Sequence, residues 1–304
     1  MDKSTTSTSK PKKRKKLKGG HSSMTRRSMR RWSWLFIGPV FAAFIIGFIW
    51  PFAQGIYLSF CGKFNTISNA KFQGFTNYIK AFQDATFGHA FWFTALFAIV
   101  SVILINLLAF AAAYALTQGV KGSNLFRTVF FMPNLIGGIV LGYLWSMIFD
   151  GILYIYKTNI LAKAEYGFWG LIILLLWQQV GYMMIIYIAG LQAVPEDMIE
   201  AAKIDGATKT QTLFRVIIPN VMPSITICTF LTLTNGFKLY DQNLALTGGQ
   251  PFRQTEMLAL NISNGYSAVN TRGIAQAKAV IFFILVATLG IAQLVSTRNK
   301  EVQQ

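Results

Sequence analysis

Residues 200–219 read EAAKIDGATKTQTLFRVIIP, a polar stretch between two long apolar runs that decides how this chain is organised. Its first residues, Glu200 to Lys203, favour a helix, and Gly206 then breaks that helix. Pro219 opens the next apolar run, a position where proline is tolerated because the first turn of a helix leaves its N–H groups unbonded. The stretch therefore predicts a short helix, a turn and a second helix on the water side of a membrane.

The composition indicates a membrane protein. Hydrophobic residues make up 53% of the 304 residues and charged residues only 13%, so a soluble domain could not cover its own apolar surface. A spanning helix needs about 20 mainly apolar residues. Six segments meet or approach that length, and the fifth is short and rich in threonine: Trp34–Phe60, Phe91–Thr117, Thr128–Phe149, Phe168–Gln192, Ser224–Tyr240 and Ile274–Ser296. The expected fold is an all-α integral membrane protein with six transmembrane helices.

The basic residues predict the orientation of these helices. Residues 1–31 hold twelve Lys and Arg against one acid, Asp2, and such a tail remains in the cytoplasm. We expect this tail to be disordered and to lie against anionic membrane lipid, residues 32–297 to form the transmembrane domain, and residues 298–304 to form a cytoplasmic end. No nucleic-acid-binding module follows the basic run, so we expect no nucleic acid as a partner. Six spans place both termini and the polar stretch in the cytoplasm.

The sequence carries no catalytic or metal-binding pattern. Cys61 and Cys228 lie in and near apolar segments, and the two histidines have no triad or metal-ligand spacing. A glycine-rich phosphate-binding loop of the required length is also missing. We therefore expect the chain itself to be no enzyme and to bind neither a metal nor a cofactor.

The polar stretch closely resembles the EAA loop of ABC-importer permeases, in which Glu-Ala-Ala is followed at fixed spacing by Gly and by Ile-x-Leu-Pro. Val216 and Ile218 are conservative replacements of the usual Ile and Leu. The resemblance implies a cytoplasmic coupling helix around Glu196–Ala207 that contacts a partner ATPase, and ATP and Mg would be bound by that ATPase. The residues implied in coupling are Glu200, Ala201, Ala202, Asp205, Gly206 and Pro219.

Two further segments are similar to loops of carbohydrate-importer permeases of the maltose and multiple-sugar class. They are residues 72–78, FQGFTNY, and residues 246–249, LTGG; Tyr240 and Gln250 are mild departures from the usual pattern. The resemblance covers about residues 32–297 and corresponds to the short, six-span form of the type I permease. It implies the permease subunit of an ATP-driven, binding-protein-dependent sugar importer in a bacterial cell membrane. Its partners would be a second homologous permease, a cytoplasmic ATPase dimer and an extracellular solute-binding protein.

Polar side chains in the fourth and fifth segments are candidates for contact with a solute. Buried polar groups in spans are costly and usually face a cavity or another helix, and a sugar needs amides, hydroxyls and an aromatic face. The resemblance places the family's substrate contacts on the same two spans. The candidates are Gln178, Gln179, Tyr182, Thr229, Thr232 and Asn235. Hydrogen bonding between helices is the alternative role for each of them.

Other readings remain open at this point. The same type of importer could carry glycerol phosphate or an amino acid, although a phosphate would favour more cations in the spans than Lys278 alone. A secondary carrier is a further alternative, but such carriers usually have ionisable groups in mid-span. We expect Lys278 to snorkel to the outer interface, with pairing to Asp241 or a place along the pathway as alternatives. Gly138 and Gly142 predict close helix packing.

Overall fold

The computed structural model describes residues 35, 37–64, 66 and 69–298. The basic tail and the last six residues, for which the sequence predicts a disordered and a cytoplasmic segment, lie outside these ranges. The chain divides into two compact units, one up to Gln54 and one from Gly55 onward. Within the described residues, β-pairing is limited to an isolated antiparallel bridge between Cys61 and Phe72, so the fold is all-α as predicted.

The described part of the first unit is an apolar helical segment. A π-helical turn, η1 (Ile45–Ile49), leads into α2 (Trp50–Ser59), which runs on into the second unit. The apolar span extends over Ile37–Ser59, and none of its most hydrophobic window is buried inside the protein. This is the first predicted segment, shorter by a few residues. Such a helix needs lipid or another protein to cover it.

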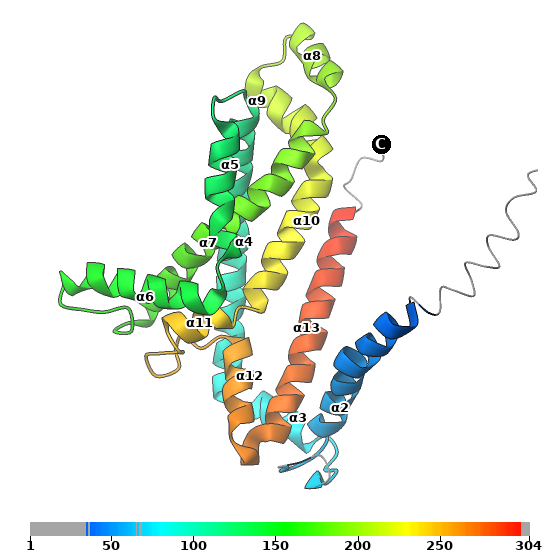
Figure 1. Ribbon diagram of the computed structural model, residues 1–304, viewed down its shortest axis with the longest axis vertical. Helices are drawn as coiled ribbons and strands as arrows, with labels where there is room; N and C mark the ends of the chain where they lie inside the picture. The colour runs from blue at the N-terminus through cyan, green and yellow to red at the C-terminus, as the bar shows by residue number, and fades with distance from the viewer. Residues whose placement is uncertain (1–34, 36, 65, 67–68, 299–304) are drawn as a thin grey trace, which may run out of the picture. The chain divides into compact units, whose positions relative to one another are not determined.

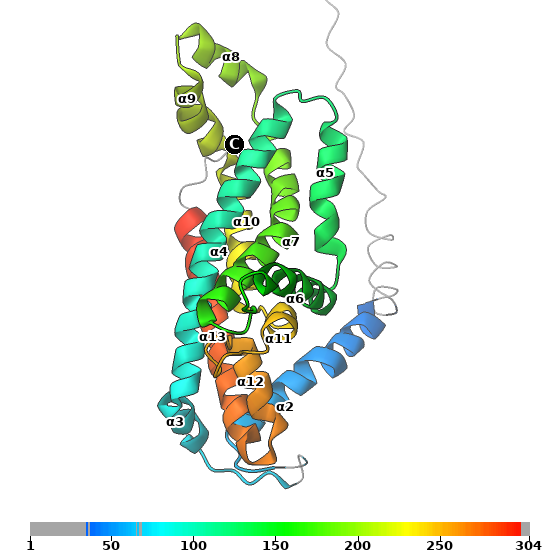
Figure 2. The ribbon, with the colours of Figure 1, turned by 90° about the vertical axis from the view of Figure 1, so that its left-hand side faces the viewer.

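The second unit is built around α7 (Ala164–Gln192), which packs against both α4 (Ala85–Thr117) and α10 (Ile218–Phe237). More than half of the apolar window of α7 is buried, at 56%. Leu171, Met183 and Tyr187 from α7 lie in the same core as Phe97 and Ile105 from α4. Figures 1 and 2 both show α13 (Arg272–Arg298) running beside α10. The second, fourth and sixth predicted spans are therefore confirmed.

The weak fifth segment becomes a full span because its helix begins earlier than hydropathy predicts. The helix starts at α9 (Lys209–Thr212), continues through a π-helical turn, η4 (Leu213–Ile217), and joins α10 without interruption. Together they give 29 residues. The wider turn stands directly before Pro219, which has no N–H to donate to the preceding turn.

The third predicted segment, Thr128–Phe149, is wrong as a single straight helix. It divides into α5 (Ser123–Phe131), a 3-10 turn η3 (Met132–Leu135) and α6 (Gly138–Tyr154), and the two halves are bent by 102°. Ile136 and Gly137 have extended backbone at the break. The described residues thus contain five apolar helices long enough to span a membrane, or six if the bent pair counts as one span.

The remaining helices are short and join the long ones at their ends. They are α3 (Thr76–Gln83), α8 (Glu196–Ile204), α11 (Asp241–Leu246), α12 (Leu258–Ser267) and the 3-10 turn η5 (Val269–Thr271). The α11 helix packs against α6.

Close packing at Gly138 and Gly142 is confirmed, and the partner is α11. A Cβ atom at Gly138 would stand 2.7 Å from the Cβ atom of Asp241, and one at Gly142 would stand 2.5 Å from the Cβ atom of Ala245. Real Cβ atoms do not approach so closely, so these two glycines allow α6 and α11 to touch.

Gly142→Ala should lower the thermal stability of the purified protein by about 1–3 kcal/mol, because it overfills this contact. Gly151→Ala is the matched control in the same helix. Its Cβ atom would meet nothing within 4 Å, so the higher helix propensity of alanine should leave stability unchanged or raise it by up to about 1 kcal/mol. Equal melting temperatures for the two variants would contradict this packing.

Candidate functional site

The polar stretch forms the helix–turn–helix that its sequence predicts. Helix α8 ends after Ile204, and Gly206 follows with a φ angle of +78°, a backbone conformation suited to glycine. The N–H of Ala207 donates to the carbonyl oxygen of Ala202 at 2.9 Å. Thr208 and Gln211 then form a reciprocal capping box that begins α9. The turn between the two helices is thus closed by hydrogen bonds of its own.

Helix α8 presents an open surface. In Figures 1 and 2 it lies with α9 at one end of the second unit, beyond the ends of α7 and α10. No residue of α8 is buried; Glu200 and Ala201 are exposed, whereas Ala202 is half-buried. Met198 and Ile204 are also exposed, the latter at 86%. Acidic and apolar side chains side by side on a projecting helix are suited to docking against another protein.

Pro219 and Asp205, also predicted for coupling, differ in their surroundings. Asp205 is exposed at the C-cap of α8, next to Gly206. Pro219 is half-buried and lies inside the long helix, at the start of α10. Pro219 therefore belongs to the long helix that follows the turn after α8, and not to the exposed surface of α8.

A polar pocket of about 320 Å³ lies where α7, α10 and α11 meet. It is lined by Gln179, Asn235, Lys238, Leu239, Tyr240, Asp241 and Gln242. The amide of Asn235 donates to Oε1 of Gln179 at 3.1 Å. Gln242 donates in the same way to Oε1 of Gln178 at 2.8 Å. Amide groups of α7 thus pair with amide groups of α10 and α11 at this pocket.

The other predicted pathway residues lie elsewhere. Thr232 is fully buried between α10 and α4, where its Oγ1 accepts a hydrogen bond of 3.0 Å from Asn106. Asn106 also accepts a bond of 2.6 Å from the hydroxyl of Tyr187. Tyr182 is half-buried with its ring 6.4 Å from that of Phe131, and Thr229 is half-buried as well. The structure therefore brings Gln179 and Asn235 into a common pocket and leaves these three outside it.

Sequence reasoning missed Asn106 and Gln242. Asn106 is an amide inside the long apolar run of α4, and an unpaired amide there would be costly. An amide isolated in an apolar run is a signal in the sequence that could have identified Asn106 as a residue with a polar partner on another helix. Gln242 lies in the short helix α11 and carries no comparable signal in the sequence.

Lys278 does not snorkel to the interface, and the prediction that it does is wrong. Its side chain is 4% exposed. Its Nζ atom lies 2.6 Å from Oδ2 of Asp84 and 2.9 Å from Oδ1 of Asn261. Asp241, the partner weighed from the sequence, lies in the polar pocket instead. A buried ammonium is tolerated here because it is paired and hydrogen-bonded.

The ion pair belongs to a network that joins α4, α12 and α13. Asn261 donates to Oε2 of Glu256 at 3.0 Å, and Glu256 accepts two bonds from Arg253 at 2.9 and 3.0 Å. Asp84 lies just before the α4 span. Burial of its carboxyl opposes ionisation, but hydrogen bonds from Lys278 and Thr86 outweigh that effect and lower its pKa to about 2.

A polar pocket between apolar helices, with an exposed helix beyond their ends, is compatible with a multi-pass membrane transport protein. The family of inner membrane components of binding-protein-dependent transport systems matches residues 110–300. The chain belongs to this family, whose members are transport subunits. Membership decides against the secondary carrier left open above.

Individual relatives agree with this assignment. The chain is 40% identical over 280 residues to a probable starch degradation products transport system permease protein, AmyD, of Thermoanaerobacterium thermosulfurigenes, covering 90% of this chain and 96% of the relative. It is 31% identical to the multiple sugar-binding transport system permease protein MsmF of Streptococcus mutans, and the match covers 89% of this chain and 97% of that protein. A bacterial ABC transporter involved in the import of the acidic polysaccharide alginate has the same fold, with a TM-score of 0.76 at 17% identity over 91% of this chain and 99% of that one. The fold is that of a type I ABC-importer permease.

Proposed function

We propose that this chain is the transmembrane permease subunit of an ATP-driven, binding-protein-dependent sugar importer in a bacterial cell membrane. The observation that carries the proposal is the pocket shared by Gln179 and Asn235. Its lining combines amides and a tyrosine hydroxyl, which can exchange hydrogen bonds with the hydroxyl groups of a sugar. The names of the relatives in starch-product and multiple-sugar transport support the same substrate class.

The charges in the pocket favour a neutral solute. Lys238 and Asp241 are the charged residues of the lining and have opposite signs. A glycerol phosphate would need an excess of cations to offset its charge. One cation and one anion would also suit a zwitterionic amino acid, and the names of the relatives in starch-product and multiple-sugar transport support a sugar instead.

Coupling would take place at α8. In the proposed orientation the N-terminus, the C-terminus and α8 lie in the cytoplasm, where an ATPase dimer that binds ATP and Mg contacts the exposed side chain of Glu200. A second, homologous permease would complete the pathway, and an extracellular binding protein would deliver the sugar. Support for this arrangement comes from the exposed surface of α8 and from the family's dependence on binding proteins.

Gln179→Ala and Asn235→Ala should each reduce sugar transport several-fold and alter the preference among sugars, because one net hydrogen bond to the solute contributes about 0.5–1.5 kcal/mol. Thr232→Val is the structural control, since Thr232 bonds to Asn106 between helices. It should lower the yield of assembled transporter without altering preference. The measurement is transport of a sugar series normalised to assembled complex. If both pocket variants kept the same preference among sugars, this pocket would not be part of the transport pathway.

A further inference from the structure

A second pocket, of about 320 Å³, carries unpaired positive charge. Its lining includes Lys63, Lys71 and Lys80 and contains no acidic residue. Among the described residues, no acidic side chain forms an ion pair with these lysines. The rest of the lining supplies amides and backbone, notably Gln73 and Asn270. The composition of this pocket is therefore suited to an anion.

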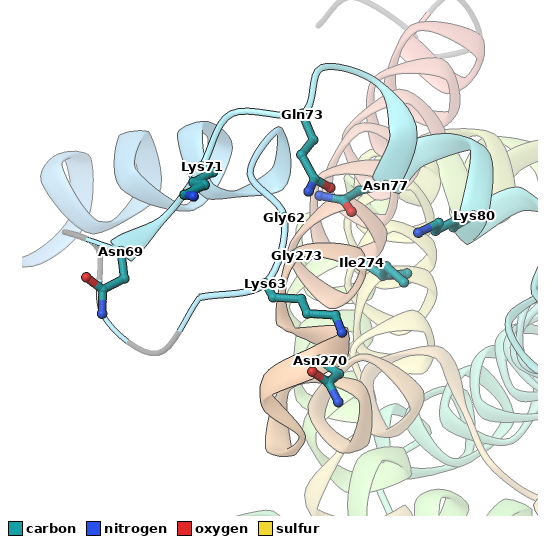
Figure 3. A pocket seen from close by; sticks show the side chains of 10 residues that line it. All are labelled: Gly62, Lys63, Asn69, Lys71, Gln73, Asn77, Lys80, Asn270, Gly273 and Ile274. Carbon is teal, nitrogen blue, oxygen red and sulfur yellow. The ribbon is translucent and has the colours of Figure 1, made fainter.

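The walls of this pocket are firmly built. The amide of Asn77 is buried and donates to the carbonyl oxygens of Ser59 and Cys61 at 2.9 and 2.6 Å. Gly273, at the start of α13, packs so closely that an added Cβ atom would stand 2.3 Å from the carbonyl oxygen of Cys61. Figure 3 shows Lys63 and Lys80 extending toward Ile274 from two different segments. The backbone that leads to Lys63 is thus tied to the helix that carries Lys80.

The pocket lies at the depth of a membrane surface. Gly62 follows the end of the first apolar span at Ser59, Lys80 precedes the start of the α4 span at Ala85, and Asn270 lies at the start of the last apolar span at Val269. Three span ends therefore lie within a few residues of the pocket. Lipid headgroups occupy this depth whichever side of the membrane it faces.

An exposed aromatic stripe runs beside the lysines. We define it as Phe72, Phe75, Ile79 and Phe82. Ile79 and Phe82 lie on α3, Phe75 is the N-cap residue of α3, and Phe72 lies just before the helix in the bridge to Cys61. In chain order the four residues are 68%, 69%, 57% and 73% exposed. On α3 the polar residue Asn77 and the small residue Ala81 are buried instead. A short helix that, together with the residues just before it, exposes large apolar side chains beside lysines has the composition of a segment that lies in a membrane interface.

We propose that Lys63 and Lys80 bind the phosphate of an anionic phospholipid headgroup, while the aromatic stripe rests in the adjoining interface. The apolar stripe favours a lipid over an acidic soluble protein, because water-exposed surfaces seldom keep four large apolar side chains together. The site is separate from the sugar pocket, and the inference does not depend on which solute is transported.

The test compares lysine pairs of equal charge in the intact transporter. The complex containing full-length K63Q/K80Q, and one containing K157Q/K163Q as control, are placed in nanodiscs of phosphatidylcholine with or without phosphatidylglycerol. Retained phosphatidylglycerol is then measured by native mass spectrometry. Lys157 and Lys163 also lie beside span ends but do not line a common pocket, whereas Lys63 and Lys80 do. At about fivefold for each lysine that contacts the headgroup, the first variant should lose up to about 25-fold, and the control should lose less. Equal losses in both variants would overturn the proposal.

Two further measurements distinguish a lipid headgroup from a soluble phosphate and from a protein partner. Soluble glycerol phosphate should not displace the bound lipid; efficient displacement would reduce the site to a general anion site. A dye attached at Phe82→Cys should be quenched by brominated lipid. Cys61 and Cys228 of this chain are buried, and the complex without the substitution, treated with the same dye, gives the background from its other subunits. The lipid proposal would be contradicted if the dye were not quenched and if K63Q/K80Q impaired only ATP hydrolysis stimulated by the binding protein. That result would assign the surface to a protein partner.

Discussion

Glu200→Lys and Gly206→Val should each leave the permease inserted and assembled but reduce sugar-stimulated ATP hydrolysis to its unstimulated level. The side chain of Glu200 is exposed, so reversing its charge should cost the fold little while it removes the proposed contact with the ATPase. Valine at the φ angle of +78° adopted by Gly206 costs about 1–2 kcal/mol and would distort the turn after α8. The measurement is ATP hydrolysis by the reconstituted complex with and without sugar-loaded binding protein.

Glu165→Lys is the matched control for charge. Glu165 is also exposed and lies in the first turn of α7, the opposite end of that helix from α8. It should retain stimulation. If complexes containing Glu200→Lys or Gly206→Val showed the same sugar-stimulated ATP hydrolysis as the unsubstituted complex, α8 would not be the coupling element.

Lys278→Met should lower stability by about 1–3 kcal/mol, because it leaves the partly exposed carboxylate of Asp84 without its charged partner. The expected result is a marked loss of assembled complex and a lower melting temperature. Replacing both partners, as D84N/K278M, should restore much of the loss, since no uncompensated charge remains. A double variant no more stable than Lys278→Met would show that the effect comes from packing rather than charge.

This ion pair should also be insensitive to pH over the physiological range. The pKa of Asp84 is lowered to about 2 in the folded protein, so its contribution to stability is complete above the unfolded value of about 4 and is lost only as the pH falls toward 2. The difference in melting temperature between the unsubstituted protein and D84N/K278M should therefore stay constant between pH 5 and 8.

Local sequence signals predicted local structure well. The glycine after a polar helix predicted the turn at Gly206, and its positive φ angle confirms it. The spacing of Gly138 and Gly142 predicted a close contact, although only the structure identifies α11 as the partner. The bend after Leu135 was missed because hydropathy measures how apolar a segment is and not whether it is straight.

Long-range pairings were beyond the reach of a single sequence. Lys278 and Asp84 are 194 residues apart, and nothing local distinguishes Asp84 from Asp241 as the partner. Helix periodicity placed Gln178 and Tyr182 on one face of α7. Which neighbouring helix covers that face depends on the packing of α5, α10 and α11.

Sugar-dependent ATP hydrolysis is the measurement that tests the central claim most directly. The chain is assembled in proteoliposomes with its paired permease and ATPase, and hydrolysis is recorded with the binding protein and a panel of neutral sugars, glycerol phosphate and amino acids. The account predicts that at least one neutral sugar stimulates hydrolysis, and only when the binding protein is present. Stimulation by glycerol phosphate or an amino acid, with no response to any sugar, would contradict it.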